Sequence, residues 1–403
     1  MGLSDHEQPG GGSPHGREAE MTNSPDVRVA HQPHRHAHTS QRMTTAPTLG
    51  VEEEYLLVDE TTKLPVPVGS TTVAELSDVD FHREFSQAQT EFATPVCTGL
   101  DDLRQQLLRG RRTLAKAARH HGAMLVATGA PPLGRPGPPP VTGKPRYQRM
   151  VELYGALTDD QGMCGCHVHI GVPDLEHAVR ASNHLRPWLP ALLVLGANSP
   201  FFDGRDTGHA SWRTNVWARW PVAAVPPHFR CADEYDALVS RLVAAEVILD
   251  DSMVYWYIRP SRHAPTVEVR VADVSATVEE AVLQAALTRA LVTTALEEER
   301  PSPGVPDVVL RAACWRAALV GLEGRCLDPF TASAAPGWDL VDTLLAHVRP
   351  VLSASGDLDM VMSCLSWLRA HGGGATRQRA ALRTHGDLRA VVDILAVARD
   401  GRP

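Results

Sequence analysis

The feature that most constrains the fold is the segment TLGVEEEYLLVD at residues 48–59, which alternates like a β-strand but contains three consecutive glutamates. Because strand side chains alternate between two faces, Glu53 falls on an otherwise apolar face, and Glu52 and Glu54 share the opposite one. Two carboxylates about 7 Å apart repel by roughly 2–3 kcal/mol at an effective dielectric constant near 20. Water or cations must offset that repulsion, so the segment fits either a solvent-facing strand or a cation site.

Two later segments repeat the contrast between an apolar face and a charged or imidazole face. TVEVRV places Glu268 and Arg270 opposite alternate valines, and CHVHIGV places His167 and His169 opposite an apolar face. Each pattern also has a plainer explanation, because an exposed strand can carry a charge pair or two solvated histidines. Neither segment alone decides between a site and a surface.

A fourth segment, EFSQAQTEFATPV, carries Glu91 in the middle of an apolar stretch. One buried hydrogen bond would be enough to satisfy such a carboxylate. Glu84 has the opposite parity, so both glutamates reach one face only if a β-bulge lies between them. Glu91 is therefore the better site candidate, and the role of Glu84 stays open.

Side chains from these four segments would meet if the strands are neighbours in one sheet. The common surface would then gather Glu52, Glu54, Glu91, His167 and Glu268. Uncompensated carboxylates brought together in this way are very costly. Mg²⁺ or Mn²⁺ would offset the cost, and such ions typically bridge to substrate phosphates. The pattern thus predicts a metal–nucleotide site on an open sheet.

The phosphates in such a site would need further ligands, because the chain contains neither a GxxxxGKS/T motif nor a GxGxxG motif after a strand. Arginines act as fixed cationic clamps on phosphate. We predict that Arg213, Arg259 and Arg270 bind the nucleotide. Nearby tryptophans fit either the core or a surface on which a base stacks: Trp212, Trp217, Trp220 and Trp256.

The chain is predicted to be an α+β protein. Helical periodicity covers roughly 99–121, 174–197, 231–250, 277–299, 307–320 and 338–348, and the strand candidates are 48–58, 85–94, 123–128, 166–172 and 265–272. No regular βαβ rhythm separates the strands, which argues against a doubly wound parallel sheet. The stretch 131–150 is rich in Pro and Gly and is expected to be an irregular loop. Its basic end could close over an anionic ligand, or the loop could be only a connector.

The first 47 residues differ from the rest of the chain. They are rich in Gly, Pro, Ser, Asp and His and include HQPHRHAH at 31–38. Such a composition cannot bury a core, so we expect residues 1–47 to be a disordered tail, although its histidines could bind a transition metal. The tail has no apolar stretch typical of a secretory signal, and Met43 is a second candidate start of translation. Residues 48–403 contain no linker-like stretch and are predicted to form a single domain.

The composition is that of an ordinary globular enzyme, with 403 residues of which 43% are hydrophobic and 21% charged. A net charge of −8 gives no field that would attract nucleic acid or an anionic membrane. No apolar run reaches the ~18 residues of a membrane span. The seven cysteines include no CxxC pair, so we expect reduced thiols and a cytoplasmic protein.

Several long motifs, taken in their order along the chain, resemble a known family. They are GVEEEYLLVD, EFSQAQTEFATPVC, CGCHVHIGVPD, ANSPFFDGRDTGHASWRTNVWARWP, YIRPS and PTVEVRVADV. Together they resemble the carboxylate–amine ligases of the glutamate–cysteine ligase type 2 group, the YbdK-like proteins. The resemblance runs from about residue 48 to about residue 400 and leaves out the tail.

The resemblance implies a glutamine-synthetase-like fold. In that fold a curved, mostly antiparallel sheet binds ATP and divalent metals on its concave face and is backed by helices on the other. The family's metal-site positions fall on Glu52, Glu54, Glu91, His167 and Glu268, and its E-V-R strand also supplies Arg270. A further acidic position falls on Glu84. His169 stands where more distant ligases often carry Asn, so its role stays open.

The resemblance also implies a reaction. A substrate carboxylate would attack the γ-phosphorus of ATP, and an amine would displace phosphate from the acyl phosphate to give an amide. Arg270 and Glu268 would be the catalytic residues, with Arg270 stabilising the transferring phosphoryl group. Glutamate and cysteine are the usual small-molecule substrates of the family. Another amine substrate, and assembly into a homo-oligomer, stay open.

Two other functions fit some of these residues. His-x-His at a strand end also occurs in zinc-dependent amidohydrolases, but those enzymes need an eightfold strand–helix alternation that this pattern lacks. A non-catalytic ligase homologue that binds ATP is the second alternative. Such a protein would have no reason to keep so costly a cluster of charge.

Overall fold

The centre of the fold is a seven-stranded sheet in which every pairing is antiparallel. The computed structural model describes residues 46–78, 80–134, 140–262, 264–298 and 304–398. The strands of the sheet are β1 (Leu49–Asp59), β2 (Phe81–Arg83), β3 (Gln89–Ala93), β4 (Ala123–Val126), β5 (Gly165–Gly171), β8 (Ile258–Pro260) and β9 (Thr266–Asp273). Their order is β2-β3-β1-β5-β9-β8, and β4 pairs with the end of β1. The predicted α+β class with an antiparallel sheet is confirmed.

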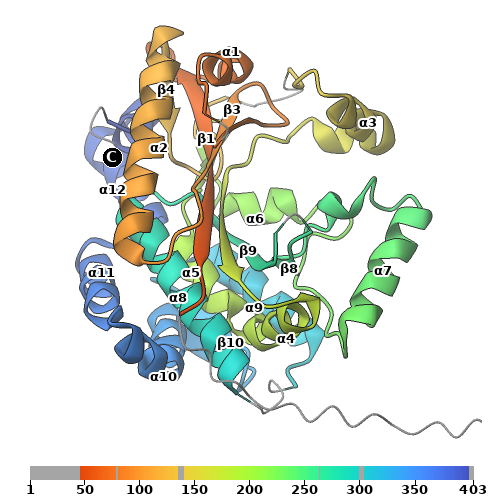
Figure 1. Cartoon of the computed structure of the whole chain (residues 1–403). Coiled ribbons are helices and arrows are strands. Elements are labelled where there is room, and N and C mark those ends of the chain that lie inside the picture. The colour runs from red at the N-terminus through yellow and green to blue at the C-terminus, as the bar shows by residue number, and fades with distance from the viewer. Residues whose placement is uncertain (1–45, 79, 135–139, 263, 299–303, 399–403) are drawn as a thin grey trace, which may run out of the picture. The chain divides into compact units, whose positions relative to one another are not determined.

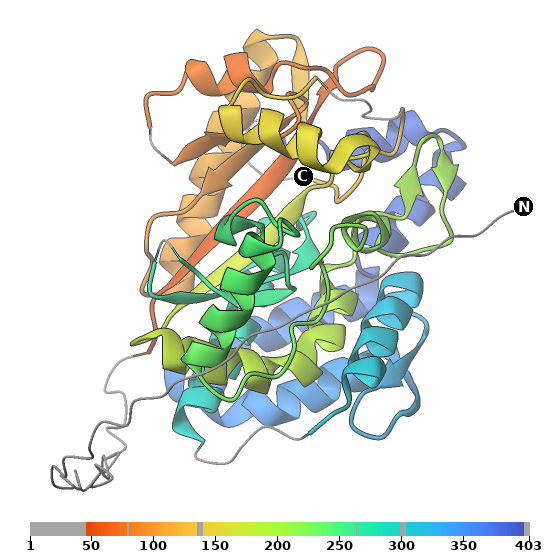
Figure 2. The same ribbon diagram turned by 90° about the vertical axis from the view of Figure 1, so that its right-hand side faces the viewer.

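Helices cover the apolar face of this sheet. Val51 of β1 and Val168 of β5 are buried in one core with residues of α2 (Leu100–His120), α4 (Leu175–Leu185), α5 (Leu189–Gly196) and α8 (Val278–Glu297). Figure 1 shows α2 to the left of β1, while α3 (Pro145–Tyr154), α6 (Trp212–Trp217) and α7 (Ala232–Ala244) lie to its right. Figure 2 turns this second side toward the viewer. The two faces of the sheet therefore have different neighbours.

The other elements complete the chain around the sheet. The helices are α1 (Gly69–Ala74), α9 (Asp307–Val320), α10 (Gly337–Ser355), α11 (Leu358–His371), α12 (Gly374–His385) and α13 (Leu388–Leu395), with short 3₁₀ turns η1 (Gly155–Thr158), η2 (Arg186–Trp188) and η3 (Asp251–Met253). Two small hairpins are formed by β6 (Phe201–Phe202) with β7 (Arg205–Asp206), and by β10 (Arg325–Asp328) with β11 (Ser333–Pro336). No helix in the described ranges has the length and apolar character needed to cross a bilayer.

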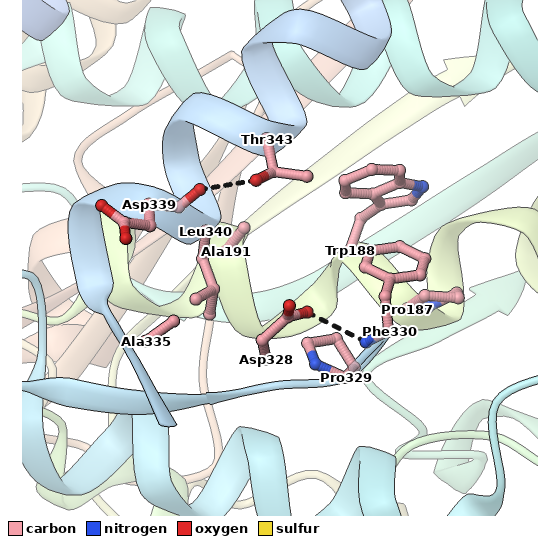
Figure 3. Close-up of a pocket in the computed structure, with 10 residues that line it drawn as sticks. All are labelled: Pro187, Trp188, Ala191, Asp328, Pro329, Phe330, Ala335, Asp339, Leu340 and Thr343. Atoms are coloured by element: carbon pink, nitrogen blue, oxygen red, sulfur yellow. Dashed lines mark hydrogen bonds between the residues drawn. The ribbon is translucent and has the colours of Figure 1, made fainter. Parts of the chain in front are cut away.

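The β10–β11 hairpin packs against α10 and the turn before α5. The ring of Phe330, at the hairpin tip, lies 4.8 Å from that of Trp188 (Figure 3). The pocket beneath them has a volume of about 30 Å³. That is about the volume of one water molecule, so this pocket is too small for an amino-acid substrate.

Three sequence-based expectations about local structure are wrong. The predicted strand 85–94 contains only β3, because residues 84–88 form the turn of a hairpin with β2. The predicted loop 131–150 ends in α3, since Pro145 occupies the first turn, where its fixed φ favours a helix. The predicted helix 174–197 is split into α4, η2 and α5, with prolines at Pro187 and Pro190. The tail prediction for 1–47 falls, except for the last two residues, outside the described residues.

The unexpected glutamate on the apolar face of β1 has a buried partner in α2. Arg111 occupies a position in the otherwise apolar buried stripe of α2. Its guanidinium lies 2.5 and 3.0 Å from the two carboxylate oxygens of Glu53. The hydroxyl of Tyr55 also donates to Glu53. Arg111 donates further hydrogen bonds to the carbonyls of Ser275 and Ala276, at the turn that leads into α8. This ion pair therefore joins β1, α2 and the β9–α8 turn.

We expect Arg111→Ala to lower the free energy of unfolding by about 3–5 kcal/mol, because it leaves the buried carboxylate of Glu53 without its cation. Arg109→Ala is the matched control on the same helix. Arg109 pairs with Asp78 and Asp80, but its side chain is 40% exposed, so its loss is expected to change stability by no more than about 1 kcal/mol. Urea-induced unfolding measures both. Equal losses in the two variants would contradict a special role for the buried pair.

Candidate active site

The register of the central strands brings the acidic and imidazole side chains to one face. Glu54 of β1 lies opposite Glu91 of β3, and Glu52 of β1 lies opposite His167 of β5. Further along the sheet, His169 of β5 lies opposite Glu268 of β9. These side chains point away from the apolar face because each occupies the alternate position of its strand. The five predicted metal-site residues therefore share one face.

A β-bulge between β5 and β9 places Arg270 beside this row. Cys166 pairs with Ala272, but Val168 pairs with Val269, so two residues of β9 lie opposite His167 alone. One of those two residues is Arg270. A bulge of this kind redirects a side chain locally, and here it brings a guanidinium next to the imidazole.

Two groups in the described chain have ligand atoms close enough to hold a cation. The first consists of Glu52, Glu91 and His167, the second of Glu52, His169 and Glu268, and within each group the ligand atoms lie within 4.8 Å of one another. Glu52 belongs to both. The Nε2 atoms of His167 and His169 are buried without a hydrogen bond, which is the state expected of nitrogens available to a metal. Glu54 belongs to neither group and lies 4.0 Å from His167.

The charges in the two groups influence each other. Burial would raise the pKa of Glu52, but contacts with His167 and His169 at 3.3 Å each hold that pKa well below its ordinary value. Burial lowers the pKa of His167 to about 4, and the positive charge of Arg270 acts in the same direction. Burial opposes the charging of His169 as well, but Glu268 and Glu52 outweigh it and raise the pKa of His169.

Burial dominates the pKa values of the carboxylates nearer β3. Burial raises the pKa of Glu84 to about 7, and the neighbouring Glu54 adds to the effect. Burial and then the charge of Glu84 raise the pKa of Glu91 well above its ordinary value. Burial also raises the pKa of Glu54, although Arg213 and Arg270 oppose it. This end of the site therefore favours the arrival of cations.

Glu268 lies between two arginines. Arg259 donates to it from Nε at 2.7 Å, and Arg270 donates to it from Nη1. Burial would raise the pKa of Glu268, but Arg259 and Arg270 hold it far below its ordinary value. Arg259 also donates to the carbonyls of Ser252 and Val254, so it is held firmly. The Nε of Arg270 is buried without a partner.

A cavity of about 180 Å³ opens over this face of the sheet. Its floor includes the glutamates at positions 52, 54, 84 and 91, together with His167 and Arg270. Its walls come from α3, from the end of α6 and from the segment before β8: Arg146, Tyr147, Trp217, Trp220 and Tyr255. The cavity thus has an anionic floor with one guanidinium and a largely aromatic wall.

Comparison with known proteins agrees with this arrangement. Residues 48–393 match the model of a protein family described as glutamate–cysteine ligase family 2. The chain belongs to this family. Two relatives carry the name “Putative glutamate--cysteine ligase 2”. One, numbered 2-1, from Saccharopolyspora erythraea, is 53% identical over 352 residues, which cover 87% of this chain and 94% of the relative. The other, numbered 2-2, from Mycolicibacterium vanbaalenii, is 50% identical over 361 residues, which cover 88% and 98%.

A solved structure also matches the fold. The glutamate–cysteine ligase of Francisella tularensis in complex with AMP superposes with a TM-score of 0.65 at 14% sequence identity, over 87% of this chain and 88% of that one. Such a likeness shows that the two chains share a fold. It confirms the fold inferred from the motifs, while the sequence identity to the two bacterial relatives confirms the family resemblance.

In this family member, Arg213 is buried beside the site and does not line its cavity. Its guanidinium lies 3.4 Å from the carbonyl oxygen of Arg270, and its backbone N–H donates to Ser199 Oγ. The hydroxyls of Ser199 and Ser211 donate to Asp273, the buried last residue of β9. Asp273 was not among the predicted site residues, because one acidic residue at a strand end has no distinctive pattern.

Sequence reasoning also missed most of the cavity wall. Gln89, Arg146, Tyr147 and Tyr255 line the cavity, but none belongs to a pattern that would single it out. The basic end of the 131–150 stretch was the one signal, and it supplies Arg146 and Tyr147 through α3. The predicted tryptophans differ in their surroundings. Trp217 and Trp220 line the cavity, whereas Trp256 is buried among Phe229 and Tyr235.

We expect Gly165→Ala to lower the free energy of unfolding by about 1–3 kcal/mol, the usual cost of overpacking. A Cβ atom at this position would lie 2.3 Å from Nη2 of Arg213 and 2.8 Å from Nε2 of His167. Gly143→Ala is the control, because its Cβ would meet nothing within 4 Å. Chemical denaturation of both variants measures the difference. Unchanged stability in Gly165→Ala would mean that Arg213 and His167 are not held as tightly as described.

Proposed function

We propose that this chain is an ATP-dependent carboxylate–amine ligase, specifically a glutamate–cysteine ligase that forms γ-glutamylcysteine, and that residues 48–403 are its catalytic domain. The observation that carries the proposal is the pair of acid–imidazole groups that share Glu52 beside Arg270, in a member of a ligase family. The names of the relatives support glutamate and cysteine as substrates. The AMP complex of the Francisella tularensis enzyme fits a nucleotide site on this fold.

The two groups around Glu52 would hold Mg²⁺ or Mn²⁺. Carboxylates suit both ions, and the imidazoles of His167 and His169 favour Mn²⁺ among them. Buried Nε2 atoms without hydrogen bonds, and carboxylates whose pKa values are raised by burial, fit such cations. Bound there, the cations supply positive charge that neutralises the phosphates of ATP. Glu54, beside His167, stays within the proposal as a neighbouring ligand.

The three arginines have different roles in binding phosphate. Arg270 lines the cavity and has an unpaired Nε, so we assign it to the transferring γ-phosphoryl group. Glu268 positions Arg270 as its ion-pair partner, and Arg259 in turn holds Glu268. Arg213, at the carbonyl of Arg270, adds a further positive charge. Arg259 and Arg213 therefore support nucleotide binding mainly through their neighbours.

The reaction requires the reacting groups of two substrates, the γ-phosphate of ATP and the carboxylate of glutamate, to meet at the cavity of about 180 Å³. A carboxylate oxygen of glutamate attacks the γ-phosphorus of ATP, the bond to the β-phosphate oxygen breaks, and ADP leaves. The amine of cysteine then attacks the acyl carbon of the resulting acyl phosphate, and phosphate leaves as the amide forms. The aromatic wall of Trp217, Trp220 and Tyr255 limits the access of water to the acyl phosphate. Orientation and charge stabilisation account for most of the catalysis.

The experiment that tests the function is ADP release by the full chain with Mg²⁺-ATP across a matrix of carboxylates and amines, with mass detection of the amide. Release that needs both glutamate and cysteine, with γ-glutamylcysteine as product, is the expected result. Release with another amine would support the ligase function but identify a different amine substrate. ATP binding without any substrate-stimulated release would identify a non-catalytic homologue.

We expect Arg270→Gln to lower the rate of ADP release at saturating substrates about 100-fold or more, because it removes a preorganised charge from the transferring phosphoryl group. Arg262→Gln is the control, since Arg262 lies just beyond β8 and pairs with Asp236 on α7. Its rate is expected to match the wild type. Thermal melting of both variants shows whether the fold is intact. A normal rate in Arg270→Gln would remove this residue from the catalytic role.

We expect the wild-type chain to bind two Mn²⁺ ions, and Glu52→Gln to lose both, because Glu52 is common to the two groups. Glu91→Gln should lose one ion and His169→Ala the other, leaving one each. Glu279→Gln, whose exposed carboxylate pairs with Arg104, is the control. The electron paramagnetic resonance of free Mn²⁺ gives the stoichiometry without any need for turnover. Two ions retained by Glu52→Gln would rule out a shared ligand.

A further inference from the structure

A second cavity lies between the end of α9 and the start of α12, and we call it the α9–α12 cavity. Its volume is about 190 Å³, close to that of the candidate active site, and the two cavities share no lining residue. Such a volume holds about six water-sized groups. Ala197, Ala210 and Leu322 give it a buried apolar floor, and Glu323 and Arg383 are exposed side chains of its lining.

Opposite charges in this cavity are available to a ligand. Within the described ranges, Glu323 and Arg383 form neither an ion pair nor a hydrogen bond with another residue. Arg379 differs, because it is bound to Asp206 and to a carbonyl oxygen. In the first turn of α12 the N–H of Thr376 also has no protein partner, as is usual at a helix start.

These groups together match one kind of molecule. A carboxylate would bind Arg383, an ammonium group would bind Glu323, and a small side chain would lie on the apolar floor. We propose that the α9–α12 cavity binds a free α-amino acid with a small side chain. The cation and the anion of its lining distinguish it from a plain anion site, which would have no use for Glu323.

The cavity is close in the chain to the residues that hold the active site. Ala197 precedes Asn198, whose N–H donates to Asp273 at 2.7 Å. A Cβ on Gly374, the first residue of α12, would lie 2.3 Å from Asn198 Oδ1, so the helix start rests on this residue. The α9–α12 cavity is therefore linked to the candidate active site through Asn198 and Asp273.

The test measures binding of L-valine and L-alanine to the full chain by isothermal titration calorimetry without nucleotide. Arg383→Ala and Glu323→Gln should each weaken binding at least ~10-fold, because each removes a charge-assisted contact. Thr376→Phe should have the same effect by filling the cavity without changing its charge. N-acetyl-L-valine, which lacks the ammonium group, should bind the wild type at least ~10-fold more weakly than L-valine.

Two controls separate the cavity from the active site. Arg349→Ala removes an exposed arginine of α10 outside the cavity, and Arg270→Gln disables the proposed catalytic site; both should bind as the wild type does. Binding lost in Arg270→Gln but kept in Arg383→Ala would place the amino acid in the active site and overturn the proposal. So would tight binding of N-acetyl-L-valine or of inorganic phosphate, or no binding at all. ADP release, measured separately, decides the ligase function in every case.

Discussion

The ion pair between Glu53 and Arg111 determines which way β1 faces. A strand that slips by one residue exchanges its two faces, and here that slip would bury Glu52 and Glu54 and expose the apolar set. Because Glu53 is a buried carboxylate on the core face of β1 and pairs with the buried Arg111 of α2, such a slip would also separate these two charges. The pair thus specifies which face of β1 is buried, although two charges must be buried to form it. The site residues on β3, β5 and β9 are placed by pairing, directly or in turn, with β1.

The site face carries more negative than positive charge, and the excess is distributed unevenly. Near β9, Glu268 has two arginine partners within the protein, Arg259 and Arg270. Near β3, Glu54 and Glu91 lie directly opposite each other without a cation between them, an arrangement that destabilises a sheet. A fold that keeps this arrangement needs charge from outside. In the proposed function, Glu268 holds the guanidinium of Arg270 steady, while the two groups that share Glu52 would receive metal ions together with a phosphate-bearing substrate.

Alternation along single strands was enough to predict which side chains share one face of the sheet. It separated Glu52 from Glu53 and put His167, His169 and Glu268 opposite their apolar neighbours, and the antiparallel order of the strands then brought them together. Periodicity also located most of the long helices, because an amphipathic face is a local property of the sequence. The same reasoning mistook a hairpin turn for a strand around Glu84, since it cannot tell a short turn from a continuous extended segment.

What could not be predicted depends on contacts between distant parts of the chain. Arg111 reaches Glu53 across 58 residues, and Gln378 of α12 donates to Asn198 across 180. Neither partner of these contacts can be identified from its own neighbours in the sequence. However, an arginine in the apolar stripe of α2 and a glutamate on the apolar face of β1 are both exceptions to an apolar pattern, and their charges are opposite. Two such exceptions in one sequence predict each other, because each charge is too costly to bury alone. Pairing the exceptions to a pattern therefore adds long-range information that the pattern itself lacks.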